Sequence, residues 1–170
     1  MKMKFIAFTI FAFTACLSVA NAQSTVVDVA VGSKDHTTLV AAVTAAGLVP
    51  TLQSAGPFTV FAPTNGAFAK LPAGTVDYLL KAENKATLTK ILTYHVVAGK
   101  FNAAAVVKAI TDAKGALALK TVSGGTLTAS LKDGKVILTD EKGGVATVVA
   151  ADLNAGNGVV HVIDSVVLPK

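Results

Sequence analysis

The sequence predicts an α+β fold. The first half alternates helical patterns with short β-branched runs, whereas from residue 116 onward apolar residues recur with a period of two between glycine-containing turns. A helix-rich half that leads into an antiparallel sheet is typical of α+β domains, or of a β-sandwich that carries helices on one side.

The first residues have the layout of a secretory signal peptide. Lys2 and Lys4 precede an apolar run over residues 5–20, and Ala20-Asn21-Ala22 forms a small-residue cleavage pattern. The apolar run is shorter than the roughly 20 residues that a transmembrane helix needs. We therefore expect export, to the periplasm or out of the cell, without stable insertion in the membrane after cleavage.

Cleavage would leave one domain without cysteine. Of 170 residues, 1–22 form the expected leader, and 23–170 have the length of a single domain. The one cysteine, Cys16, lies in the leader, so disulfides, thiolate catalysis and Cys-based zinc sites are excluded for 23–170. Lipidation at Cys16, within a poor version of a lipoprotein cleavage site, is the alternative.

The charged residues argue against nucleic acid as a partner. The formal net charge of +5 falls to +3 once Lys2 and Lys4 leave with the leader. Every basic residue is a lysine, and the lysines are scattered singly along the chain. Arginine is the preferred residue for bidentate contacts with guanine and phosphate. The lysines are therefore interpreted as a solvated surface, and nucleic-acid binding is not expected.

The elements of the first half can be placed in order. A helix is expected over 37–46, because an apolar helical rhythm ends at Gly47 and Pro50. The run "GPFTVFAP", ending at Pro63, predicts a strand. Three short helices follow, in "GAFAKL", "VDYLL" and "KATLTKIL", each after a capping residue. "TYHVV" then indicates a buried strand, and Asn102 opens a helix over "AAAVVKAI".

The last third predicts a series of antiparallel strands. Its turns contain Gly124-Gly125, Asp133-Gly134, Gly143-Gly144 and Asn157-Gly158, and the Asp-Gly pair is the strongest hairpin signal. The final run, "VVHVIDSVVLP", is apolar on both alternating faces, which indicates a central strand rather than an edge strand.

Three stretches together resemble the fasciclin domain family. "GPFTVFAPTNGAFAKLPAGTVDYLL", "LTKILTYHVVAGK" and "DLNAGNGVVHVIDSVVLP" are similar, in order and spacing, to its first conserved box, its central Tyr-His motif and its second conserved box. The likeness covers roughly residues 24–169. It implies a wedge-shaped β-sandwich with several short helices packed along it. It also implies a secreted or surface protein of the small bacterial form that acts in adhesion and is not an enzyme.

The Tyr-His motif supplies the candidate partner-binding residues, Tyr94 and His95. In animal members of the family this motif is implicated in integrin-dependent adhesion, but an Asn-Lys-Asp-Ile-Leu-like run also linked to integrins has no counterpart here. If residues 93–97 are extended, the two side chains point to opposite faces. We expect one of the two to lie in the core, and His95 to be the buried one, bonded to polar groups there.

The other histidines do not suggest a metal site. No H-x-H, H-x-x-x-H or H-E-x-x-H spacing occurs. His36, near a helix start, is expected at the surface, and His161, between two valines of a strand, is expected to be buried and hydrogen-bonded. We predict no metal and no cofactor.

No catalytic constellation is recognised in the sequence. A G-x-S-x-G elbow is absent, and Ser123 fits a hairpin turn. Asp140 and Glu141 are expected on a solvated hairpin, and Asp152 and Asp164 are expected to cap turns or make structural hydrogen bonds. The phenylalanines outside the leader sit in apolar runs that indicate core positions, which leaves sugar stacking unsupported: Phe58, Phe61, Phe68 and Phe101.

These observations favour a non-enzymatic module for adhesion or surface contact. Its partner would be a protein or a polysaccharide, and the protein is expected to be monomeric. Two alternatives remain open: a small-ligand carrier or weak enzyme with a pocket near His95, and a structural component of the envelope or matrix. An apolar cavity with an exposed His95 imidazole would favour the carrier or enzyme, and a packed imidazole would not.

Overall fold

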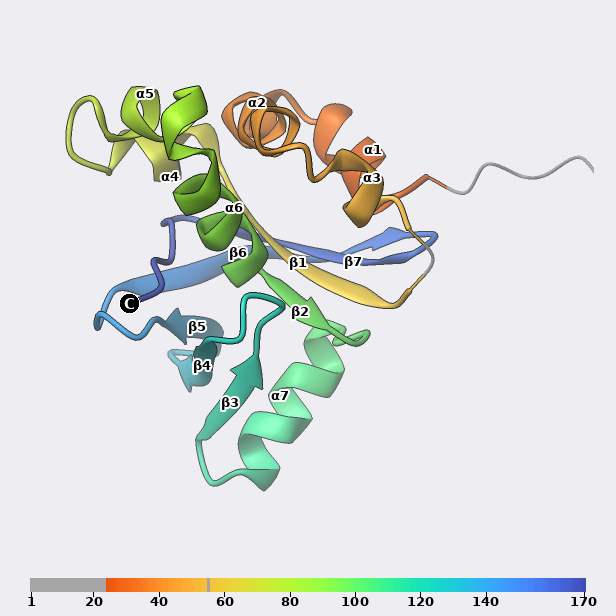
Figure 1. Cartoon of the computed structure of the whole chain (residues 1–170). Helices are drawn as coiled ribbons and strands as arrows, with labels where there is room; N and C mark the ends of the chain where they lie inside the picture. The colour runs from red at the N-terminus through yellow and green to blue at the C-terminus, as the bar shows by residue number, and fades with distance from the viewer. Residues whose placement is uncertain (1–23, 55) are drawn as a thin grey trace, which may run out of the picture.

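The computed structural model describes residues 24–54 and 56–170, so the expected leader and Cys16 lie outside the described residues (Figure 1). The helices are α1 (Val26–Val31), η1 (Lys34–His36), α2 (Thr37–Ala46), α3 (Val49–Leu52), α4 (Asn65–Ala69), α5 (Thr75–Leu80), η2 (Ala82–Asn84), α6 (Lys85–Tyr94) and α7 (Ala103–Asp112). The strands are β1 (Phe58–Pro63), β2 (Val96–Ala98), β3 (Ala116–Lys120), β4 (Thr126–Lys132), β5 (Lys135–Thr139), β6 (Val145–Ala155) and β7 (Gly158–Ile163). The α+β prediction is confirmed.

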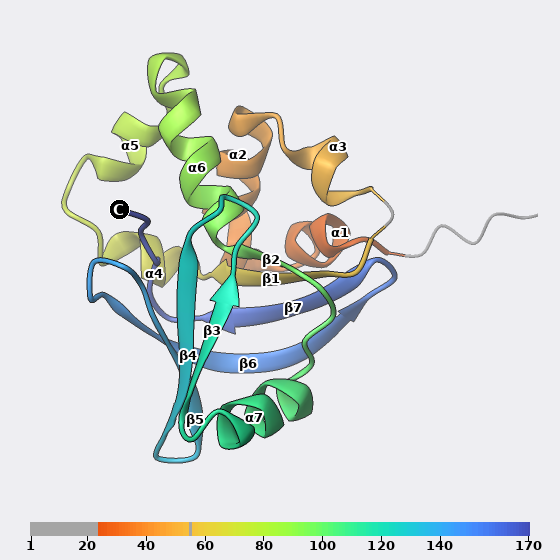
Figure 2. The same cartoon turned by 60° about the horizontal axis from the view of Figure 1, so that its bottom comes forward.

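The seven strands form one strongly curved sheet in the order β2-β1-β7-β6-β5-β4-β3. The strands of the last third, β3 to β7, pair antiparallel as predicted, and β1 pairs in parallel with β7 and antiparallel with β2. β6 shifts register twice along β7, and β5, β4 and β3 run across β6 and β7 (Figure 2). A bridge between Val97 and Thr121 brings β2 next to the chain after β3. The sheet is therefore close to a barrel, and the word sandwich describes it approximately.

Two hydrophobic cores lie on opposite faces of β1, β7 and β2. The helical core joins α1, α2, α3, α5 and α6 to one face, and Val60 and Val96 belong to it. The sheet core lies between the other face, strands β3 to β6 and α7, and Phe61 and Val97 belong to it. Figure 1 shows α1 to α6 on one side of β1 and β7, and α7 on the other. Because β7 is covered on both faces, all six of its residues are buried, which confirms its predicted central position.

Local sequence signals explain most of the boundaries. Thr64 caps α4 and Asn102 caps α7, because each side chain accepts a hydrogen bond from the backbone N–H three residues later. Gly47 ends α2 in the left-handed conformation, with φ of 71°, which glycine adopts without steric cost. The strand 58–63 and the hairpin at Asp133-Gly134 are confirmed.

One helix lies outside the predicted elements, and one predicted strand begins later than expected. The stretch "VVDVAV" forms helix α1, although four of its six residues are β-branched. A reciprocal capping box between Thr25 and Asp28 starts this helix, and burial of Val26 and Val27 in the helical core offsets its low helix propensity. The predicted strand "TYHVV" begins later, at Val96, because α6 continues through Tyr94. Within the described ranges, no helix is long and apolar enough to cross a membrane.

Candidate functional site

Tyr94 and His95 lie at the point where α6 passes into β2. Leu88, Ile91, Leu92 and His95 recur at helical spacing, so His95 continues the buried side of the helix as its C-cap. Tyr94, one position earlier on the helix, points into the sheet core. Both side chains are buried, with exposed fractions of 0% for Tyr94 and 2% for His95. The expectation that His95 faces inward is confirmed, whereas the expectation that the two side chains divide between core and solvent was wrong.

Both ring nitrogens of His95 have backbone partners. Nδ1 lies 2.8 Å from the Ile91 carbonyl oxygen, and the Val167 N–H donates to Nε2 at 3.3 Å. These partners fit the neutral tautomer with its proton on Nδ1. Burial lowers the pKa of His95 from 6.5 to about 4, and the Ile91 carbonyl and the Asp140 charge oppose this shift only in part. At neutral pH the ring is uncharged and has no nitrogen free to act as a base.

The low pKa of His95 makes the stability of the protein depend on pH. The unfolded chain takes up the proton near pH 6.5 and the folded chain only near pH 4, so stability is full above 6.5 and falls as the pH drops between these values. The difference corresponds to about 3 kcal/mol of unfolding free energy. Burial also lowers the pKa of His36, so this histidine likewise reduces the stability of the folded protein as the pH falls. We expect urea denaturation of the wild type to show this loss. Over the same pH range, a His95→Gln variant should lose clearly less unfolding free energy than the wild type. An equal loss in the two proteins would contradict the assignment of the pH dependence to His95.

Tyr94 joins α6 to two turns of the sheet core. Its hydroxyl donates to the Thr126 carbonyl at 2.6 Å and accepts from the Glu141 N–H at 3.3 Å. A Cβ added to Gly125 would lie only 2.6 Å from Cε2 of the Tyr94 ring, so the turn at 123–125 packs directly on the tyrosine. Burial raises the pKa of Tyr94, which keeps the hydroxyl protonated as a donor.

Removing this hydroxyl should cost stability. Tyr94→Phe leaves the Thr126 carbonyl and the Glu141 N–H without this partner, and we expect a loss of about 1.5 kcal/mol in the free energy of unfolding. Tyr78 provides the matched control, because its side chain is 56% exposed. Tyr78→Phe should change stability by less than about 0.5 kcal/mol. Chemical denaturation of both variants measures the difference, and equal effects would contradict the anchoring role of Tyr94.

The other two histidines are also buried. The surface prediction for His36 was wrong: it is 4% exposed, because η1 turns it inward, and its Nδ1 lies 2.8 Å from Ser33 Oγ. The prediction for His161 is confirmed, since its Nε2 lies 2.7 Å from the Phe101 carbonyl oxygen and its ring stacks on Phe61. Among the described residues, no group of three or more His, Cys, Asp or Glu side chains is arranged to hold a metal ion.

Three aspartates accept hydrogen bonds from backbone N–H groups of turns, a strand and a helix start. Asp140 is buried, so the expected solvated position was wrong: its Oδ1 accepts from the N–H groups of residues 142 and 144, and its Oδ2 accepts from the Leu168 N–H at 2.9 Å. The structural predictions for Asp152 and Asp164 are confirmed. Asp152 accepts from the first residue of α7 at 2.7 Å, and Asp164 accepts from the Thr147 N–H at 2.8 Å.

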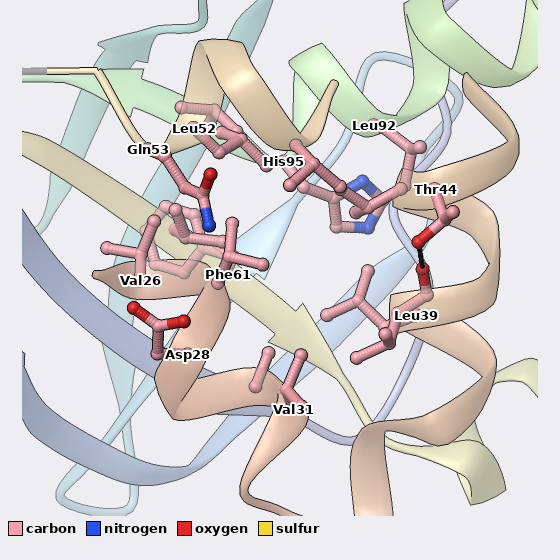
Figure 3. A pocket seen from close by; sticks show the side chains of 17 residues that line it. Val26, Asp28, Val31, Leu39, Thr44, Leu52, Gln53, Phe61, Leu92 and His95 are labelled. Carbon is pink, nitrogen blue, oxygen red and sulfur yellow. Dashed lines mark hydrogen bonds between the residues drawn. The ribbon is translucent and has the colours of Figure 1, made fainter. Parts of the chain in front are cut away.

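An apolar pocket of about 230 Å³ lies beside His95 (Figure 3). Residues of α1 line one side and residues of α2 and α3 line the other, over β1, β2 and the end of α6. The lining residues are Val26, Val27, Asp28, Ala30, Val31, Leu39, Val40, Val43, Thr44, Val49, Leu52, Gln53, Val60, Phe61, Leu92, His95 and Val96. Helix α1, which forms one side of this pocket, is not among the elements predicted from the sequence. The capping-box pattern at Thr25 and Asp28 was the signal that could have revealed the helix.

The chain is similar to a known protein family and to several known proteins. A family model described as "Fasciclin domain" matches residues 34–169. Protein sll1483 of Synechocystis sp. is 54% identical over 149 residues, which cover 88% of this chain and 76% of the relative. Immunogenic protein MPB70 of Mycobacterium bovis is 41% identical over 152 residues, which cover 86% of this chain and 70% of the relative.

A solved structure shares the fold. It is a FAS1 domain pair from the insect cell adhesion molecule Fasciclin I, described as a novel fold, with a TM-score of 0.61 and 22% sequence identity. The superposition covers 74% of this chain and 42% of the insect chain, so this chain spans less than half of that structure. The arrangement of helices around the curved sheet is therefore one that an experimental structure also contains.

Proposed function

The chain belongs to the fasciclin domain family, and from this premise we propose that it is a non-enzymatic binding module that mediates adhesion or surface contact. The observation that carries the proposal is the family match over residues 34–169. Support also comes from the solved structure of the same fold, which is part of a cell adhesion molecule. The partner would be a protein or a polysaccharide on a surface, met in the periplasm or outside the cell.

The geometry around His95 argues against the enzymatic alternative. A general base must reach a substrate proton with a free nitrogen and a pKa near the working pH. Both nitrogens of His95 are bonded to backbone groups, and its pKa is about 4. His161 is likewise buried and bonded to the backbone. The histidines therefore support a structural role.

In this proposal Tyr94 and His95 act on partner binding indirectly. Their side chains are buried, so they cannot form a contact surface themselves. Tyr94 instead holds the turns around Gly125 and Glu141, whose neighbours Gly124 and Lys142 are exposed. The partner-binding surface would include these turns, and the Tyr-His pair would fix their shape.

The proposal can be tested in the organism that makes the protein. Deleting the gene should reduce attachment of cells to a surface or to each other, and adding back the full chain should restore it. The exported protein, purified from its host and coupled to beads, should capture a surface protein or polysaccharide. Unchanged attachment in several growth conditions, together with no captured partner, would contradict the proposal.

A structural envelope component is the competing class, and it predicts self-association. We expect the protein to sediment as a monomer over a wide range of concentration. Sedimentation velocity would instead show concentration-dependent growth of the particle if the chain builds a matrix by itself.

A further inference from the structure

The pocket beside His95 has the composition of a hydrocarbon site. Ten of its lining residues are buried, and of these only His95 carries a polar side chain. Eight lining residues are valines, whose short side chains leave space between the helices that leucine would fill. One wall is α1, which precedes the residues that the family model matches, so this wall lies outside the matched stretch.

The buried side chains that the structure describes in this pocket offer a ligand no hydrogen bond. The two nitrogens of His95 are already bonded to the Ile91 carbonyl and the Val167 N–H. A polar group placed there would lose its water without gaining a partner, which costs several kcal/mol. The part of a ligand that enters the pocket must therefore be apolar.

The residues at the rim of the pocket determine which head group a bound ligand can carry at its exposed end. The exposed polar residues of the rim are Asp28 on α1, Thr44 on α2 and Gln53, the C-cap of α3 (Figure 3). Asp28 accepts hydrogen bonds from the Thr25 N–H at 2.7 Å and from the Thr25 hydroxyl at 2.8 Å, which lowers its pKa and keeps it ionised. Among the described lining residues, Asp28 is the one that is charged. A carboxylate head group would be repelled there, while the Gln53 amide can bond an uncharged head group.

The size of the pocket limits the ligand further. An apolar cavity of roughly 150 Å³ admits benzene, and drug-sized ligands occupy pockets of about 300–1,000 Å³. A volume of about 230 Å³ lies between these classes. We propose that the pocket binds the alkyl chain of a medium-length, uncharged amphiphile, such as a fatty alcohol, with the chain beside His95 and the hydroxyl at the rim between Asp28 and Gln53.

A chain-length series tests this proposal on the purified protein. Hexanol, octanol, decanol and dodecanol are titrated against an uncharged naphthylamine dye bound to the protein, and the loss of dye fluorescence is measured. Affinity should rise about fourfold with each added methylene until the pocket is full. Decanoate at neutral pH should bind at least about tenfold more weakly than decanol. No saturable binding of any alcohol, or decanoate as tight as decanol, would overturn the proposal.

The second test fills the pocket with a larger side chain introduced by substitution. Val43 lines the pocket from α2 and is 7% exposed. Val43→Phe should weaken decanol binding at least about tenfold, and Val40→Phe at the half-buried rim should also weaken it with less strain on the core. Val149→Phe is the matched control, because Val149 is 58% exposed on β6, outside the pocket. If Val43→Phe does not fold, Val40→Phe decides the question. The proposed site is wrong if Val40→Phe binds decanol as tightly as the wild type does. It is also wrong if Val149→Phe loses as much decanol affinity as the pocket variant. Adhesion is measured separately, so either proposal can fail without the other.

Discussion

Gly158→Ala is expected to lower the free energy of unfolding by about 4 kcal/mol or more, or to prevent folding. Gly158 begins β7 and pairs in parallel with Phe58 of β1. A Cβ at this position would overlap the Phe58 carbonyl oxygen and lie 3.0 Å from the carbonyl carbon. Because these are backbone atoms of the central strand pair, no side chain can rotate away to relieve the overlap. Circular dichroism and urea denaturation of the variant measure the effect.

Gly66→Ala is the matched control for this prediction. Gly66 lies in α4, and an added Cβ would meet nothing closer than Thr64 Oγ1 at 3.7 Å. Alanine is a better helix former than glycine, so this variant should be as stable as the wild type or up to about 1 kcal/mol more stable. If Gly158→Ala proves equally harmless, β1 and β7 are not as close as the structure has them.

His95→Ala is expected to cost about 3 kcal/mol of unfolding free energy. The change removes the acceptor of the buried Val167 N–H and leaves a cavity that adds to the pocket beside it. Thr87 is exposed on the same helix, and Thr87→Ala should leave stability within about 0.5 kcal/mol of the wild type. Thermal and urea unfolding of the two variants give the comparison.

The same variant distinguishes a structural role from a direct binding role for His95. If the imidazole fixes the fold, binding to a surface partner should fall in proportion to the loss of folded protein, and cooling should restore part of it. Lost binding at an unchanged melting temperature would mean that His95 meets the partner itself. That result would contradict the buried position that the structure gives it.

Much of the fold could be predicted from local sequence patterns. The strand over 58–63, the helix over 37–46 and the hairpin at 133–134 each have a strong apolar period and clear turn residues. Helix α1 lacks such a pattern, because its valines favour a strand. The capping box of Thr25 and Asp28 and packing on the helical core make the segment helical. The parallel pairing of β1 with β7 was also hidden, since it joins segments about a hundred residues apart.

The site was predictable in its residues but not in its geometry. The Tyr-His motif identified Tyr94 and His95, yet the aromatic and β-branched neighbours suggested a strand, whereas the spacing from Leu88 continued the helix. The sequence predicts surface positions for His36, near a helix start, and for Asp140, before a glycine turn. Their burial depends on contacts that sequence does not show, such as that of Asp140 with the distant Leu168 N–H. The pocket depends on four separate helices and two strands, so no single motif contains it.

The position of β7 has a mechanical consequence for the chain when it is pulled from its two ends. The Gly156 N–H donates to the Ser24 carbonyl, so the first described residues are tied to the start of β7, while residues 164–170 leave from its other end (Figure 1). A pulling force between these two points would run along β7 and load its hydrogen bonds with β1 and β6 in shear. All the bonds of the strand would then share the load at once, rather than opening one after another as in a zipper.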